Sequence, residues 1–304
     1  MKLTSIITVN YNQPGVTFAL LRSVRKHCCR IPVEVILVDN SPSLNYEDDF
    51  KAVCPGLVYI RTGVNIGFAG ANNLAMTRAK GDYILLLNND TEISEGFVET
   101  MVQEMEANPS IGLLSPLIKY YDDPALIQYA GFTPMNYITA RNKAIGYKEE
   151  DRGQYNNVSR ETGFCHGAAV MCRRHDLAKA GLMEENYFLY YEELDWCEKF
   201  KRIGKKIWFT GKTFVYHKES ISVGKESAVK TYFITRNRML YIRRNTGWVN
   251  RVAFSLYYTF VGVPRQFLIL VSRGKYCLAK HTLRALWWNF AHSKKSKRLG
   301  YSFL

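Results

Sequence analysis

The sequence lacks the signatures of several common protein classes. It has seven cysteines, an odd number, and none lies in a Cys-x-x-Cys pair or a Cys/His cluster with zinc-site spacing. No G-x-x-x-x-G-K-[ST] loop is present, and the glycines of residues 67–70 do not have the spacing of a dinucleotide fingerprint. These absences argue against a disulfide-stapled domain, a P-loop NTPase, a kinase and an NAD enzyme. A single lysine precedes a short apolar run at the N-terminus, so we expect no secretory signal and a reduced, cytoplasmic protein.

Acidic residues are almost missing from the last part of the chain. Residues 218–304 hold 17 Lys/Arg but only two Asp/Glu, whereas residues 1–217 hold 24 and 25. The formal net charge of +14 therefore comes from a basic tail on a nearly neutral body. Such an excess is typical of proteins that bind nucleic acid, an anionic membrane or phosphorylated molecules. No nucleic-acid recognition motif accompanies the charge, so we expect no nucleic-acid partner.

Short apolar segments alternate with helical patterns in the first 120 residues. This alternation predicts an α/β fold, a mainly parallel sheet flanked by helices. A polar cluster follows each predicted strand, and ligands of such sheets bind beyond the carboxyl ends of the strands. The residues that we expect along this rim are Asn10, Asn12, Asp39, Asn65 and Asp90. Turn chemistry alone also explains any single one of these clusters.

Two further clusters carry side chains suited to catalysis. Asn88-Asn89-Asp90 ends the apolar strand at 83–87 and offers the oxygen ligands that Mg²⁺ and Mn²⁺ prefer. The same residues also make a good turn and helix N-cap. Glu192, Glu193 and Asp195 open a predicted helix after a run of aromatic residues, as suits a general base beside a sugar-stacking wall. Acids in a first helical turn are equally typical partners of the helix dipole.

Taken together and in order, these segments resemble glycosyltransferase family 2. The segments that carry the resemblance are residues 7–12, 38–40, 65–73, 87–91, 188–195 and 216–217. The resemblance covers about residues 3–245 and is greatest to the rhamnosyltransferase-like branch of bacterial cell-surface polysaccharide synthesis. It implies a GT-A fold and inverting transfer of a sugar, with rhamnose as the candidate, from a dTDP- or UDP-sugar to a lipid-linked or saccharide acceptor.

The resemblance also implies roles for single residues. Asp90 and His217 match ligands of a divalent metal, Mg or Mn, with Asn88 in the place of the motif's first acidic residue. Glu193 matches the catalytic base, where the family usually has Asp; Glu192 stays an alternative base, and Asp195 belongs to the same acidic group. The implied donor-binding residues are Thr8, Asn10, Asn12, Asp39, Asn65, Gly67, Asn72, Asn88 and Asn89.

Residues 246–304 are predicted to form a basic, aromatic-rich helical region after a catalytic domain of residues 1–245. Arg251 and Arg265 enclose only 13 residues, fewer than the about 20 that a membrane-spanning helix needs, and Pro264 is expected to break or kink the helix. We therefore expect helices that lie on the anionic inner face of the cell membrane. A helical cap with a solvated basic face is the alternative.

Other interpretations of the function and of two sequence segments stay open at this point. A non-catalytic nucleotide-sugar-binding subunit of a membrane glycan assembly complex would carry the same motifs. The small residues of 163–169 permit either close approach of a substrate or core packing. Arg236-Asn237-Arg238 fits either contacts to phosphates or a solvated helix face.

Overall fold

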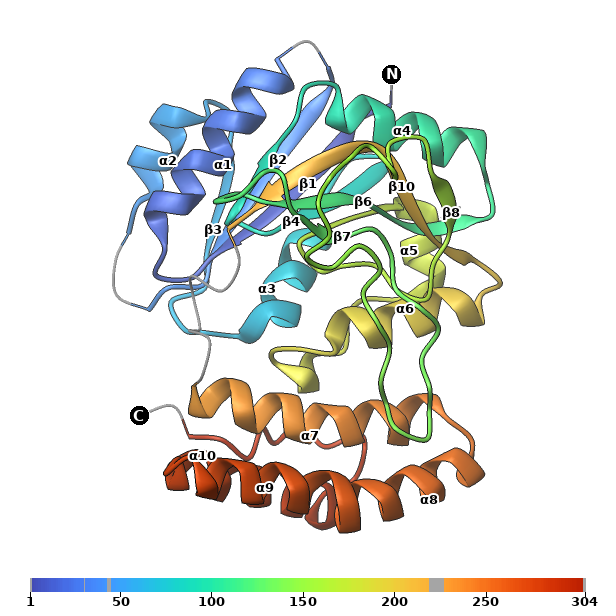
Figure 1. Cartoon of the computed structure of the whole chain (residues 1–304). Helices are drawn as coiled ribbons and strands as arrows, with labels where there is room; N and C mark the ends of the chain where they lie inside the picture. Colours follow the sequence, from blue (N-terminus) through green and yellow to red (C-terminus); the bar gives the residue numbers. More distant parts are fainter. Residues whose placement is uncertain (1, 30, 43–44, 219–226, 303–304) are drawn as a thin grey trace.

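A mixed sheet forms the centre of the molecule (Figure 1). The structure, a computed structural model, describes residues 2–302 except 30, 43–44 and 219–226. Within these residues the strand order is β3-β2-β1-β4-β9-β6-β10-β5, with β7 added to β6 and β8 to β10. The predicted α/β class is confirmed.

The N-terminal half of the sheet is parallel. β1 (Thr4–Asn10) lies between β2 (Val33–Asp39) and β4 (Tyr83–Leu87), and β3 (Val58–Arg61) lies beyond β2. All five residues of β4 are buried, as a continuous apolar strand covered on both faces requires. The carboxyl ends of these strands therefore meet at one edge of the sheet.

The second half of the sheet is mixed in direction. β9 (Ala169–Arg173) runs antiparallel to both β4 and β6 (Ile111–Tyr120), and β10 (Lys206–His217) runs parallel to β6. β5 (Thr91–Ile93) is antiparallel to β10, and its Thr91 pairs with His217. The short strands β7 (Ile127–Tyr129) and β8 (Ser159–Glu161) complete the sheet. This register brings the end of β10 beside Asp90, which immediately precedes β5.

Helices cover both faces of the sheet (Figure 1). One core lies between the sheet and α1 (Pro14–His27), α2 (Glu47–Val53) and α4 (Phe97–Ala107). The other core contains residues of α3 (Gly67–Met76), α5 (Arg174–Ala180) and α6 (Glu192–Arg202). A single 3-10 turn, η1 (Glu185–Tyr187), precedes α6.

The C-terminal helices form a further layer beside α3 and α6 (Figure 1). It consists of α7 (Ala228–Asn245), α8 (Trp248–Tyr257), the π-helical turn η2 (Tyr258–Gly262), α9 (Val263–Ser272) and α10 (Tyr276–Ala291). α7 lies within the predicted first domain but packs against α8 and α10. The division at residues 245 and 246 stays a prediction.

Pro264 does not end the helix in which it lies. α8, η2 and α9 continue one another from Trp248 to Ser272, and Pro264 stands in the first turn of α9, directly after the π-helical turn. A widened turn is one way to accommodate a residue without an N–H group inside a helix. Among the described residues this is the one helix that is long and apolar enough to cross a membrane, with a mean hydropathy of 1.3.

Candidate active site

A cavity of about 570 Å³ opens at the carboxyl ends of β1, β4 and β10. Its volume is in the usual range for a small-molecule site, and its position is the one expected of a ligand site in a parallel sheet. The walls include the turn after β4, the start of α3, the segment before α6 and the start of α7, where Ser227, Val229 and Lys230 line the cavity. The predicted residues among its lining are Asn65, Gly67, Asn72, Asn88, Asn89, Asp90 and His217.

Asp90 and His217 face each other in this cavity. His217 Nε2 lies 3.2 Å from Asp90 Oδ1, and His217 Nδ1 lies 2.8 Å from the carboxamide oxygen of Gln128. Since that oxygen only accepts, Nδ1 donates this hydrogen bond, and when the ring is neutral Nε2 turns a lone pair toward Asp90. Asp90 Oδ1 is buried and receives no hydrogen bond from the described residues.

Two facing acceptors fit a divalent cation. Adjacent ligands of an octahedral ion at about 2.1 Å lie about 3 Å from each other, close to the separation of Asp90 and His217. Within the described part of the chain, no group of three or more His, Cys, Asp or Glu side chains could hold a metal ion. A cation bound here therefore needs further ligands from water and from the phosphates of a substrate, which is common for magnesium.

The start of α3 closes one side of the cavity. Asn65 Oδ1 accepts hydrogen bonds from Gly67 N, at 2.9 Å, and from Asn40 Nδ2, at 2.8 Å. Gly67 has a φ of +79°, and a Cβ at this position would lie 2.6 Å from the carbonyl oxygen of Phe188. Glycine is therefore required where α3 meets the segment before α6.

A chain of hydrogen bonds runs behind the rim. Asn89 Nδ2 donates to Thr17 Oγ1, at 2.9 Å, which donates to Asn10 Oδ1, at 3.0 Å. Asn10 Nδ2 then donates to Asp39 Oδ1, at 3.0 Å, and the Tyr59 hydroxyl donates to Asp39 Oδ2, at 2.7 Å. Asn10 and Asp39 are both fully buried, so in this conformation they support the rim from behind.

The residues before α6 have an unusual backbone. Phe188, Tyr190 and Tyr191 have φ values of 66°, 67° and 77°, in the left-handed region that favours glycine. Such conformations cost about 1–3 kcal/mol each and persist only when the surroundings enforce them. Phe188, Leu189 and Tyr190 line the cavity, so this strained segment, residues 188–191, belongs to the site.

Two buried residues of α7 hold the 188–191 segment in place. Asn237 Nδ2 donates to the carbonyl oxygens of Leu189 and Tyr190, both at 2.8 Å, and of Tyr187, at 3.0 Å. The Arg236 guanidinium donates to the carbonyl oxygens of Asn186 and Tyr187. Arg236 and Asn237 are both fully buried. Two interpretations of these residues came from the sequence, contacts to phosphates or a solvated helix face. For Arg236 and Asn237 both interpretations are wrong.

Glu192 and Glu193 follow the strained segment directly. Burial, and secondarily the neighbouring Glu193, holds the pKa of Glu192 well above its usual range, and Glu192 Oε2 has no hydrogen-bond partner among the described residues. Burial also raises the pKa of Glu193. The Glu193 side chain is only half-buried and points toward Gly167, where a Cβ would lie 4.0 Å from its carboxyl carbon. Gly167 follows His166, a residue of the cavity wall.

Residues 5–180 match the model of the family described as glycosyl transferase family 2. The chain belongs to this family. It is 23% identical over 244 residues to the N-acetylglucosaminyl-diphospho-decaprenol L-rhamnosyltransferase of Mycobacterium tuberculosis, covering 71% of this chain and 77% of the relative. It is 24% identical over 192 residues to the rhamnosyltransferase WbbL of Escherichia coli, covering 57% of this chain and 68% of that one. The predicted family and the predicted transferase class are confirmed.

Solved structures share the fold of this glycosyltransferase. GalNAc-T7 with UDP, GalNAc and Mn²⁺ superposes with a TM-score of 0.65 at 16% identity, over 96% of this chain but 57% of that one. The mannosyltransferase PcManGT of Pyrobaculum calidifontis, with GDP-Man and Mn²⁺, gives a TM-score of 0.57 at 14% identity, over 95% and 87%. These likenesses confirm the predicted GT-A fold.

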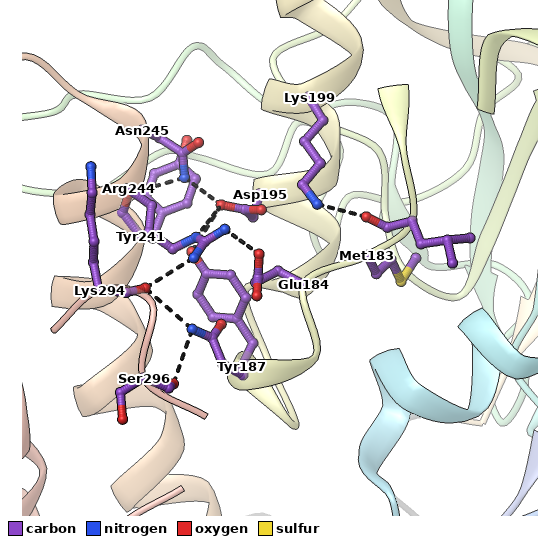
Figure 2. A network of polar contacts seen from close by, with 12 residues as sticks. Met183, Glu184, Tyr187, Asp195, Lys199, Tyr241, Arg244, Asn245, Lys294 and Ser296 are labelled. Atoms are coloured by element: carbon purple, nitrogen blue, oxygen red, sulfur yellow. Dashed lines mark hydrogen bonds and ion pairs between the residues drawn. The ribbon is translucent and has the colours of Figure 1, made fainter. Parts of the chain in front are cut away.

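Asp195 of this glycosyltransferase does not line the cavity and instead faces Asn245 and Arg244 of α7 (Figure 2). Its Oδ1 accepts hydrogen bonds from Asn245 Nδ2, at 2.7 Å, from the Tyr187 hydroxyl, at 3.1 Å, and from Arg244 Nε, at 3.4 Å. Arg244 also pairs with Glu184 and donates to the carbonyl oxygen of Lys294 (Figure 2). Asp195 thus fastens α6 to α7 and to the C-terminal segment, and the geometry gives it a positioning role.

Other predicted residues also lie outside the cavity wall. Thr8 is buried in β1, and the Asn12 backbone N–H donates to Ser41 Oγ at 2.8 Å. Glu192 and Glu193 stand behind the 188–191 segment and not in the wall itself. Contacts of these residues, and of Asn10 and Asp39, with a donor or acceptor stay predictions. Polar or aromatic wall residues that were missed as site residues include Tyr11, Asn40, Phe68, Gln128, His166, Ser227 and Lys230.

His166 is the most informative of the missed residues. Its Nδ1 accepts a hydrogen bond from Ala168 N at 3.2 Å, so the ring proton is on Nε2. Burial, and then the neighbouring His217, lowers the pKa of His166 to about 3. His166 is therefore a neutral hydrogen-bond donor at working pH. The sequence signal that could have identified His166 is the presence of a histidine within residues 163–169, where most residues are small.

Proposed function

We propose that this glycosyltransferase inverts the anomeric carbon while transferring a sugar from a dTDP- or UDP-sugar to a lipid-linked saccharide of a surface polysaccharide. The Asp90–His217 pair in the rim cavity is the observation that carries the proposal. The two relatives named as rhamnosyltransferases favour rhamnose as the sugar, and the name of one includes a lipid diphosphate.

Asp90 and His217 would hold a divalent ion, Mg²⁺ or Mn²⁺. When bound, such an ion supplies Lewis-acid stabilisation of the negative charge that develops on a departing nucleoside diphosphate. Gln128 holds His217 in the tautomer that leaves Nε2 free for this role. Both solved structures compared above contain Mn²⁺, which supports a metal in this fold.

The donor would lie along the rim, against the start of α3 and the turn after β4. Asn65, Gly67 and Asn72 line the α3 side, and Asn88 and Asn89 line the β4 side. The His166 Nε2–H is a neutral donor in the same wall and suits a sugar hydroxyl or a phosphate oxygen. Asn10 and Asp39 would act through Asn89 and Thr17, which they support.

Glu193 is the proposed catalytic base. It would accept the proton of the acceptor hydroxyl as that oxygen attacks the anomeric carbon. Its raised pKa brings its basicity closer to neutral pH, where a general base is most effective. Direct displacement without a covalent intermediate inverts the configuration. Glu192 is more enclosed, and burial together with the charge of Glu193 raises its pKa well above its usual range.

The C-terminal helices would attach the enzyme to the inner face of the cell membrane, with residues 1–245 as the catalytic domain. Large apolar side chains exposed on α8, η2, α9 and α10 include Trp248, Leu256, Phe260, Leu268, Tyr276, Trp287 and Phe290. Exposed apolar surface of this extent marks an interaction site, and lysine and arginine around it favour anionic lipid. Because α8–α9 packs against α7 and α10, we propose that it lies on the membrane.

Donor binding tests the proposal. The thermal unfolding of the full chain is followed with Mn²⁺ and a panel of nucleotide sugars, starting with dTDP-rhamnose and UDP-sugars. We expect one donor to raise the melting temperature only when the metal is present, and Asp90→Ala to abolish that rise. If no nucleotide sugar stabilises the protein, the proposed function is wrong.

A further inference from the structure

A second cavity, of about 210 Å³, lies between the C-terminal helices and the hairpin of residues 132–144. Three arginines from different elements line it: Arg141 of the hairpin, Arg238 of α7 and Arg265 of α9. The π-helical turn η2 forms part of the wall, and such turns are frequent at functional sites. The apolar and aromatic part of the lining consists of Tyr257, Tyr258, Val261, Ile269 and Leu270.

The positive charge of this cavity is not compensated. In the part of the chain that the structure describes, none of the three guanidinium groups forms an ion pair with a carboxylate. Arg141 and Arg265 are exposed, and Arg238 donates from Nε to the Tyr191 hydroxyl at 2.9 Å. Guanidinium groups bind phosphate oxygens through two parallel hydrogen bonds. Three of them around one small cavity favour an anion with several phosphate oxygens.

The surroundings indicate what the anion is attached to. On one side, Val261 and Ile269 of the wall are exposed and continue into Phe260 and Leu268 of the proposed membrane face. On the other side, Arg238 contacts Tyr191, the residue immediately before Glu192 and Glu193. The cavity therefore joins an apolar surface to the acidic start of α6. A ligand with a lipid tail, a diphosphate and a sugar has its three parts in this order.

We propose that the second cavity binds the diphosphate of a lipid-diphosphate-linked acceptor. The lipid would lie along α8–α9 and the saccharide would extend past Arg238 toward Glu193. The assignment rests on the proposed function, and it adds the site that receives the acceptor. Arg141 and Arg265 are its specificity-determining residues, because both line the cavity and neither side chain forms a hydrogen bond or ion pair with another described residue.

Binding of farnesyl diphosphate to the full chain tests the site without any need for turnover. Calorimetric titration compares the wild type with Arg141→Ala, Arg265→Ala and the double variant. Charge-assisted hydrogen bonds contribute about 1.5–3 kcal/mol each, so we expect each single variant to bind about tenfold more weakly or worse. Arg273→Ala is the matched control, since Arg273 is an exposed cation at the end of α9 that does not line the cavity. We expect it to bind as the wild type does.

Three results would overturn the assignment. If Arg273→Ala weakens binding equally, the attraction is a general one between charges. If UDP competes with farnesyl diphosphate, the ligand binds in the first cavity. If inorganic pyrophosphate binds equally tightly, the lipid tail contributes nothing to recognition. Titration of the same variants with the nucleotide sugar and Mn²⁺ separates the two proposals. If the wild type binds the donor but not farnesyl diphosphate, only the assignment of the second cavity is refuted. If the wild type binds no donor, the proposed function is refuted.

Discussion

Asn237 offers the sharpest test of how the fold builds the site. Asn237→Leu keeps the approximate volume of the side chain and removes the donor for the carbonyl groups of Leu189 and Tyr190. Leaving these two part-buried carbonyl groups without their partner costs at most about 1–3 kcal/mol each, or at most about 2–6 kcal/mol together. The three left-handed residues of the 188–191 segment cost a comparable amount, about 1–3 kcal/mol each. We therefore expect the segment to leave its strained conformation and displace Glu193.

The assay for this variant separates stability from catalysis. Denaturant unfolding should show a loss of about 2 kcal/mol or more, and kcat for sugar transfer should fall at least tenfold under conditions where the protein is folded. Asn289→Leu is the matched control. Asn289 is also buried and donates to the carbonyl oxygens of Arg236 and Ala285, and among the described residues it forms no hydrogen bond with residues 188–191. It should lose stability but keep kcat. A wild-type kcat for Asn237→Leu, or an equal fall for Asn289→Leu, would refute the reasoning.

Two further predictions follow from burial and exposure. The raised pKa of Glu192 means that the folded state holds this proton more tightly than the unfolded chain does, so the stability that the protonated side chain contributes is lost as the pH rises above its pKa in the unfolded chain. Glu192→Gln should therefore raise the melting temperature at pH 8 more than at pH 4. An equal effect at both pH values would contradict this. Phe260→Glu combined with Leu268→Glu should abolish co-sedimentation with anionic vesicles and leave thermal stability unchanged, because both side chains are mostly exposed. Unchanged sedimentation would contradict the proposed membrane face. Deletion of the helices would not test this face, since Phe254 and Trp288 belong to the core.

The sequence predicted the parts of the molecule that depend on local pattern. The apolar run of β4 and the alternation around it were sufficient for the parallel half of the sheet, and they placed Asn65 and Asp90 on one rim. His217, one helix and one strand after Glu193, could return to the same rim, but its role there came from the family resemblance. The structure supplies the physical reason: β10 pairs with β5 and carries His217 to the side of Asp90.

Contacts between distant segments could not be predicted. Glu193 and Asp195 stand in the same first helical turn and have similar chemistry, yet Asp195 faces Asn245 and Arg244 of α7. Arg236 and Asn237 are polar residues on a helix and would ordinarily face solvent. Their burial depends on the carbonyl groups of a strained segment about 50 residues earlier in the chain, and nothing in the local sequence of α7 reveals those partners.

Glu193 is the proposed base of sugar transfer from a donor bound in the rim cavity, beside whose wall it lies next to Gly167. The most direct measurement is the single-turnover rate of transfer by Glu193→Gln and Glu192→Gln beside the wild type, together with their affinities for the donor. Because a positioned general base contributes about 10²–10⁴-fold, Glu193→Gln should lose at least about 100-fold in rate with donor affinity unchanged. Glu192→Gln should lose much less. Transfer at the wild-type rate by Glu193→Gln, or the large loss in Glu192→Gln alone, would contradict the claim.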